Sequence, residues 1–180
     1  MKKTVLTFGL IAGFIMIAMM TLSLVFSERI GFGHSHTLGY TILIAGSSLV
    51  FFGIRSYREN VGGGTITFGR AFAVGILITL IASVLYVVVW LIIYFNFMPD
   101  FADKYAAYMI EQARAAGESA QKIQAITDEM KGIKAMLDNP FINAAFTFIE
   151  TFPIGLIVTL ISAAILRKKP GPPVNDAVAA

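Results

Sequence analysis

Residues 70–100 read RAFAVGILITLIASVLYVVVWLIIYFNFMPD, with 29 consecutive uncharged residues between Arg70 and Asp100. This run is longer than the roughly 20 apolar residues that a helix needs to cross a hydrocarbon core of about 30 Å. At about 1.5 Å per residue it measures roughly 43 Å, so a helix built from it must tilt or extend beyond the bilayer. The stretch predicts a membrane-spanning helix over residues 71–98.

Three further segments, residues 4–26, 37–54 and 140–166, pass the same length test, and their only charged residue is Glu150. The first of them follows two lysines, as a secretory signal would. A signal core has about 7–15 residues and ends in small residues at a cleavage site, whereas this run is longer and has no such exit. We therefore expect a retained helix there, with a cleaved signal as the alternative.

The composition agrees with this interpretation. Hydrophobic residues make up 57% of the 180 residues and charged residues only 14%, and there is no cysteine. A soluble chain of this size could not bury so much apolar surface, and the absence of cysteine excludes disulfide scaffolds and thiol chemistry. The expected fold is an all-α membrane protein with four transmembrane helices in a single domain, residues 1–169, followed by a flexible tail, residues 170–180.

Basic residues gather at one side of the predicted bundle. Eight of them flank the spans at this side, against the acids Glu59 and Asp176: Lys2, Lys3, Arg55, Arg58, Arg70, Arg167, Lys168 and Lys169. An excess of Lys and Arg marks the cytoplasmic side of a membrane. Both termini are therefore predicted to be cytoplasmic, and the basic balance of the chain indicates topology rather than a nucleic-acid partner.

Residues 100–139, between the third and fourth spans, are rich in strong helix formers. Gly117 is a candidate end for a first helix, with Glu118 or Ser119 opening a second. The second half carries an apolar stripe with steps of three and four: Ile123, Ile126, Met130, Ile133 and Leu137. The stripe predicts packing within an extracytoplasmic helical segment. Its alternative role is a docking face for another membrane protein or a second copy of the chain.

Glu150 is the single acid inside a predicted span, and an intramembrane carboxylate is by default a candidate functional residue. Pro153 removes the hydrogen bond to the Ile149 carbonyl and predicts a kink. Thr147, Thr151 and Glu150 itself are candidates to hydrogen-bond near that carbonyl. The alternatives are a local packing role and a proton- or ligand-binding role.

Two other motifs invite a site assignment. His34 and His36 form an H-x-H pair, but no further ligand spacing accompanies them, and we predict no metal site and no cofactor. The run of glycines from Gly62 to Gly64 lacks the G-K-[ST] of a phosphate loop. It predicts a tight turn, beside which Arg55, Arg58 and Arg70 contact anionic lipid headgroups.

Small residues are spaced for close approach of helices, which is how spans associate in lipid. The predicted packing positions are Gly9, Gly13, Gly46, Gly53, Gly75, Thr79, Gly155 and Thr159. The spans show no polar stripe, which argues against an open aqueous pore.

Three stretches resemble the bacterial domain-of-unknown-function family 4199: FGIRSYRE at residues 52–59 with GGGTITFGRAF at 62–72, KTVLTFGLIAG at 3–13, and FPIGLIVTLISA at 152–163. The resemblance extends over nearly the whole chain to Lys169. It implies a small multi-pass protein of the bacterial cytoplasmic membrane, and it supplies no catalytic or binding residues.

For function, the sequence favours a non-catalytic membrane component that scaffolds, regulates or pairs with another membrane protein. The alternative is a small transporter or proton-coupled carrier that uses Glu150 at the Pro153 kink. A membrane-embedded enzyme ranks last, because the spans offer a single acid and no paired acids, histidines or nucleophile.

Overall fold

The computed structural model describes residues 1–30 and 32–168, without the side chains of residues 26–38. The side chains of His34 and His36, and the whole tail, residues 170–180, lie outside the described part, so the predictions for them stay predictions. The described part contains six helices and no named strand: α1 (Lys2–Ile30), α2 (Phe32–Asn60), α3 (Phe68–Phe97), α4 (Phe101–Ala115), α5 (Ala120–Leu137) and α6 (Pro140–Leu166).

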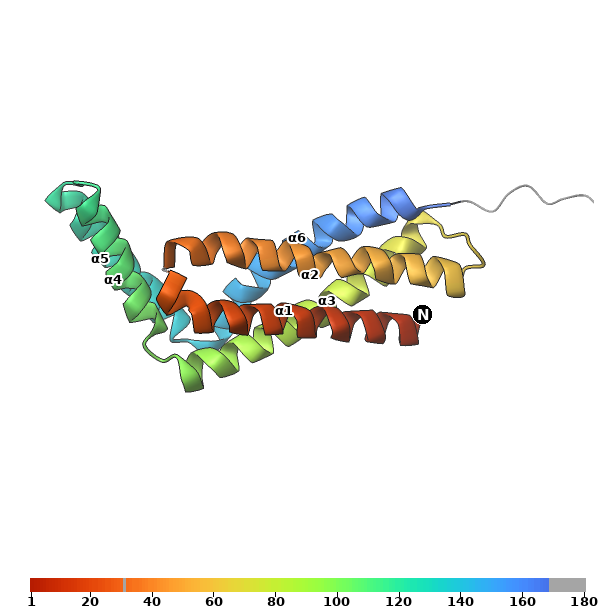
Figure 1. Ribbon diagram of the computed structural model, residues 1–180, viewed down its shortest axis with the longest axis horizontal. Coiled ribbons are helices and arrows are strands. Elements are labelled where there is room, and N and C mark those ends of the chain that lie inside the picture. The colour runs from red at the N-terminus through yellow and green to blue at the C-terminus, as the bar shows by residue number, and fades with distance from the viewer. Residues whose placement is uncertain (31, 169–180) are drawn as a thin grey trace, which may run out of the picture.

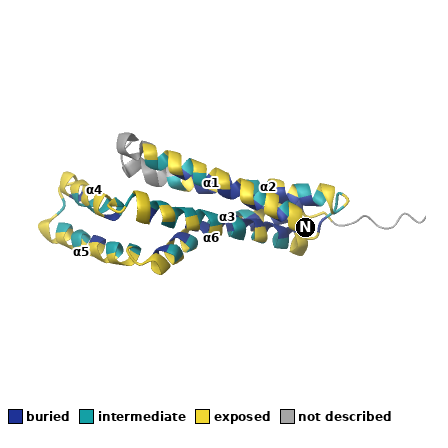
Figure 2. Ribbon diagram, turned by 90° about the horizontal axis from the view of Figure 1, so that it is seen from below, coloured by how far each residue is buried: buried dark blue, intermediate teal, exposed yellow. Residues whose placement is uncertain are grey.

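Four of these helices are long and apolar enough to cross a membrane. Their candidate spans are Lys2–Val25 in α1, Gly39–Asn60 in α2, Phe68–Phe97 in α3 and Pro140–Leu166 in α6. The expectation of an all-helical protein with four membrane-length helices is therefore confirmed. Exposed residues run along the outside of these helices (Figure 2), and many of them are large and apolar, as lipid-facing helices require.

The four long helices form a bundle (Figure 1). Both α1 and α6 pack against α2 and against α3, and α2 also touches α3. Helices α1 and α6 therefore occupy opposite corners of the bundle. Helices α2 and α3 occupy the other two corners and contact each other between α1 and α6. This arrangement places one face of α3 against α6, where the polar residues described below are found.

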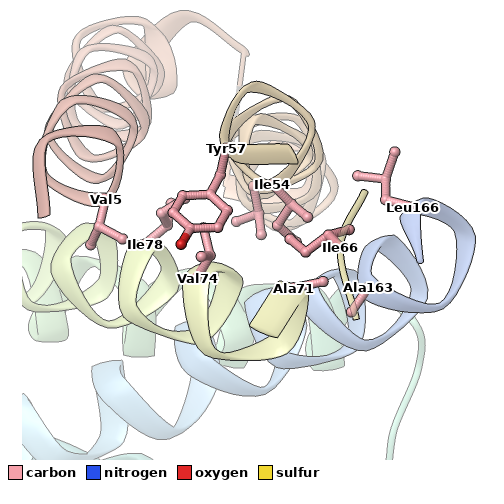
Figure 3. Packing of buried hydrophobic residues seen from close by; sticks show 10 residues of the cluster. Val5, Ile54, Tyr57, Ile66, Ala71, Val74, Ile78, Ala163 and Leu166 are labelled. Atoms are coloured by element: carbon pink, nitrogen blue, oxygen red, sulfur yellow. The ribbon is translucent and has the colours of Figure 1, made fainter. Parts of the chain in front are cut away.

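The start of α1, the α2–α3 turn and the end of α6 lie at the same end of the bundle (Figure 1). Ile66 and Lys168 exchange backbone hydrogen bonds there, at 2.9 and 2.8 Å. Ile66 belongs to an apolar cluster at this end, in which the side chain of Tyr57 of α2 points toward α3 (Figure 3). We call this end the basic end, after Lys2, Lys3, Arg55, Arg58, Arg70, Arg167 and Lys168.

Helices α4 and α5 form an antiparallel hairpin that projects from the other end of the bundle (Figure 1). Gly117 turns the chain with φ of 71°, a conformation that favours glycine. Ser119 then caps α5 by accepting a hydrogen bond from the Lys122 N–H. The segment thus folds back as two helices instead of extending α3, and both turn residues are among those expected from the sequence.

The start of α6, where the chain re-enters the bundle, is also determined by neighbouring residues in the sequence. Asn139 caps α6 by accepting hydrogen bonds from the N–H groups of Phe141 and Ile142, at 3.0 and 3.3 Å. Pro140 occupies the first turn of α6, where its missing N–H costs nothing. Helix α6 is continuous from Pro140 to Leu166 although Pro153 lies inside it.

Candidate functional site

The buried face of α6 carries a line of polar residues at four-residue spacing, which we call the polar seam: Asn143, Thr147, Thr151 and Thr159, with Gly155 completing the register. The Thr147 hydroxyl donates to the Asn143 carbonyl at 2.9 Å, and the Thr151 hydroxyl donates to the Thr147 carbonyl at 2.7 Å. Because these hydroxyls bond within their own helix, they are buried without an unpaired group. The expectation that the spans lack a polar stripe is therefore wrong.

Asn143 is the most connected residue of the seam. It is fully buried, at 0% exposure. Its side-chain oxygen accepts a hydrogen bond from the Trp90 indole N–H at 2.9 Å, and its amide donates to the Leu137 carbonyl at 3.0 Å. One side chain thus joins α3, the end of α5 and the start of α6. Its signal in the sequence is a lone amide inside an apolar helix, which does not by itself predict these partners.

Further along, α3 and α6 fit together through two glycine–threonine pairs. A Cβ at Gly75 would lie 2.7 Å from the Thr159 methyl, and a Cβ at Gly155 would lie 2.5 Å from the Thr79 methyl. Each threonine therefore fills the space that the glycine of the other helix leaves. The other predicted packing glycines also meet neighbouring helices: Gly9 against Ile81, Gly13 against Leu85, Gly46 against Met16, and Gly53 against Ile78 and Phe8.

A small cavity lies beside the seam. Its volume is about 10 Å³, and its polar lining consists of Ser47, Thr79, Ser83 and Thr151. A space of this size holds about one water molecule. The bundle therefore has a polar centre at this cavity, with room for about one water molecule.

Glu150 does not belong to the polar seam. Its side chain is exposed on α6, whereas Thr147 and Thr151 are buried. The two threonines donate to the carbonyls of their own i−4 residues and not to the Ile149 carbonyl near Pro153. The predicted grouping of these three side chains around that carbonyl is therefore wrong. Glu150 has no hydrogen bond or ion pair to any residue that the structure describes.

The three arginines predicted to contact lipid differ in their surroundings. Arg55 and Arg58 both bind the Glu59 carboxylate, at 3.0 and 3.2 Å. Arg58 also reaches the Leu166 carbonyl at 3.4 Å. Arg70 instead donates from Nε to the Tyr57 hydroxyl at 3.2 Å and has no acidic partner among the described residues.

Arg70 borders a pocket of about 270 Å³ at the basic end. We call it the basic-end pocket; its lining residues are Tyr57, Val61, Gly62, Thr65, Ile66, Thr67 and Arg70. Gly63 and Gly64 form the adjoining turn with φ of 59° and 84°, which requires glycine. Thr67 caps α3 by accepting a hydrogen bond from the Arg70 N–H at 3.4 Å.

The apolar stripe of α5 lies largely within the hairpin. Met130 is buried, and Ile123, Ile126, Ile133 and Leu137 are half-buried, in a helix whose main neighbour is α4. An ion pair between Lys134 and Asp103, at 2.6 Å, joins the two helices. The Asp103 carboxylate raises the pKa of Lys134. Much of the predicted partner face is thus used for packing inside the chain.

Four membrane-length helices with a polar seam and an apolar exterior define a helical membrane protein. A family model described as "Protein of unknown function (DUF4199)" matches residues 7–168. The chain belongs to this family, as its sequence motifs indicate. Comparisons with curated proteins and with solved structures gave no match.

Proposed function

We propose that this protein is a non-catalytic component of the bacterial cytoplasmic membrane that pairs with another membrane protein through the exposed face of α6 around Glu150. In this proposal the basic end lies in the cytoplasm, because Lys and Arg are retained there, and the α4–α5 hairpin is extracytoplasmic. The observation that carries the proposal is that Glu150, an acid inside the candidate span of α6, is exposed.

Glu150 lies so deep in the candidate span that its carboxylate would be energetically unfavourable if only lipid surrounded it. It lies 16 residues before Leu166, the last residue of α6, which corresponds to roughly 24 Å along the helix. This distance places it inside a hydrocarbon core of about 30 Å. A carboxylate facing lipid there is unfavourable by up to about 3 kcal/mol. A partner that offers a hydrogen-bond donor or a cation would remove much of this cost.

The surroundings of Glu150 suit a protein partner. Phe146, Ile149 and Ile157 are exposed on the same helix, so the carboxylate is flanked by apolar side chains that can pack against another span. The basic residues inside the candidate spans, Lys2, Lys3, Arg55, Arg58 and Arg70, lie at the basic end, and none of them has a hydrogen bond or ion pair with Glu150. We therefore expect the partner helix to supply the complementary polar or basic side chain.

The carrier alternative would need Glu150 beside a pathway within the bundle. The polar cavity holds about one water, and Glu150 is not among the residues that line it. No described feature of a single copy therefore favours transport through Glu150.

Photo-crosslinking in native membranes tests the proposal. A photoreactive residue at Ile149, which is 67% exposed, is compared with one at Phe14, which is 64% exposed on α1 at the opposite corner of the bundle. We expect a discrete protein adduct from position 149 only, and at least a severalfold weaker adduct when Glu150→Gln is added.

Co-expression of two differently tagged copies distinguishes the partners. An adduct that carries both tags identifies a second copy of this chain and overturns the choice of a different protein. Equal adducts from positions 149 and 14, or protein-free lipid adducts from both, would refute the α6 interface altogether.

A further inference from the structure

We propose that the basic-end pocket binds the phosphate group of an anionic lipid headgroup. The pocket has a volume of about 270 Å³ and opens at the end of the bundle where α2 turns into α3. Nothing in the proposed pairing through α6 depends on it, since the two sites lie at different depths of the bundle.

The positive charge of Arg70 is less balanced than that of its two neighbouring arginines. Arg55 and Arg58 share the carboxylate of Glu59, which offsets part of their charge. Arg70 borders the pocket, and among the residues that the structure describes its side chain meets only the Tyr57 hydroxyl, through Nε. Its two terminal nitrogens therefore remain available, and a guanidinium presents them in the geometry that binds two phosphate oxygens at once.

Backbone hydrogen-bond donors lie next to Arg70 at the start of α3. The first N–H groups of an α-helix have no partner within the helix. In α3 the Thr67 side chain accepts from the Arg70 N–H, which leaves the N–H groups of Phe68 and Gly69 at the helix start. Thr67 lines the pocket with Arg70, so an anion seated there would meet a guanidinium and the positive end of a 30-residue helix together.

The position of the pocket along α3 also suits a lipid headgroup. The uncharged part of α3 begins directly after Arg70, so the pocket lies at the boundary where lipid headgroups are found. Two further basic residues, Arg167 and Lys168, follow the end of α6 at the same end of the bundle. An anionic lipid would thus find its phosphate at Arg70 and its acyl chains beside the apolar surface of α3.

The test measures lipid-induced stabilisation of the full chain purified in a neutral detergent. Trp90 is the single tryptophan, and its fluorescence follows thermal unfolding. A ligand that binds the folded chain and not the unfolded one raises the midpoint, and the stabilisation grows as RT ln(1 + [L]/Kd). We expect phosphatidylglycerol to raise the midpoint increasingly with its concentration, and phosphatidylcholine to raise it much less.

Two variants separate the pocket from general surface charge. Arg70→Gln should weaken the apparent phosphatidylglycerol affinity by about tenfold or more, because one charge-assisted contact is lost. Arg55→Gln removes the same charge at the same end without touching the pocket, and should change the affinity less than about twofold. Val61→Trp, which fills the pocket and keeps every charge, should weaken binding as Arg70→Gln does.

Each remaining outcome counts against the proposal. Equal losses in Arg70→Gln and Arg55→Gln would show diffuse attraction to the basic end, and no lipid-dependent shift would show that the pocket binds no headgroup. If inorganic phosphate alone shifts the midpoint equally, and Arg70→Gln abolishes that shift, the pocket binds free phosphate and the proposal of a lipid headgroup is overturned.

Discussion

The hydroxyls of Thr79 and Thr159 lie 3.0 Å apart across the contact between α3 and α6, and the Thr79 hydroxyl also lies 3.4 Å from the Gly155 carbonyl. The methyl groups of the same two threonines fill the space above Gly155 and Gly75. Hydrogen bonding and close packing therefore coincide at one place, which is the combination that holds helices together in lipid.

Replacing Gly155 by alanine should destabilise this contact. The new Cβ would lie 2.5 Å from the Thr79 methyl, and Thr79 is itself buried between the helices. Overpacking of this kind typically costs about 1–3 kcal/mol. Thermal unfolding in detergent measures the effect, with Gly132→Ala as the control, since Gly132 has nothing within 4 Å of a Cβ. Equal midpoints for the two variants would contradict the packing described here.

The hydrogen bond between the two threonines can be isolated with valine, which keeps the methyl groups. Thr79→Val, Thr159→Val and the double variant form a cycle whose coupling free energy should be about 0.5–1.5 kcal/mol. Unfolding in detergent or bicelles supplies the values. A coupling free energy near zero would show that the pair contributes through shape alone.

Asn143→Leu should loosen the junction between α3, α5 and α6. It removes the acceptor of the Trp90 N–H and the donor to the Leu137 carbonyl, and each group left unpaired costs about 1–3 kcal/mol. Because Trp90 is the single tryptophan, its emission should shift directly. The control is Asn96→Leu, because Asn96 is exposed and its amide bonds to its own helix at Ile92. Unchanged emission and stability in Asn143→Leu would refute the junction.

The α4–α5 hairpin should loosen in acid. The Gln124 amide and the Lys131 ammonium lower the pKa of Asp128, and Lys104 lowers the pKa of Asp100. The folded hairpin thus favours the ionised carboxylates, and this stabilisation is present above the ordinary aspartate pKa of about 3.9 and is lost as the pH falls below it.

Amide hydrogen exchange along α4 and α5 between pH 6 and pH 3, corrected for intrinsic rates, should show this loss of protection. Asp128→Asn should already show weaker protection of α5 at pH 6 and a smaller change on acidification. Protection that stays constant across this range in the unmodified chain would contradict the assignment.

The proposed orientation is directly testable because the chain contains no cysteine. Single cysteines at Gln121 in the hairpin and at Asn60 at the basic end, both exposed, are labelled in intact cells with a membrane-impermeant maleimide. We expect labelling at position 121 and none at position 60 until the membrane is permeabilised. The reverse pattern would invert the topology, and equal labelling would disprove that the two ends lie on opposite sides.

Local features of the sequence determined the helices of this protein. The lengths of the apolar runs define four spans, because the bilayer thickness sets how many residues a helix needs. Gly117, Ser119, Asn139 and Pro140 define the turns and caps, because capping depends on residues a few positions apart.

Tertiary structure alone decided how each helix is rotated about its axis. A span that is apolar on all sides gives no periodic signal for which face meets lipid and which meets a neighbour. The sequence therefore suggested Glu150 beside Thr147 and Thr151, while the fold exposes Glu150 and buries the threonines. The hydrogen bond between Trp90 and Asn143 also depends on long-range packing, because its partners come from different helices. The geometry of the turn between α2 and α3 places Arg70 against Tyr57 and apart from Glu59.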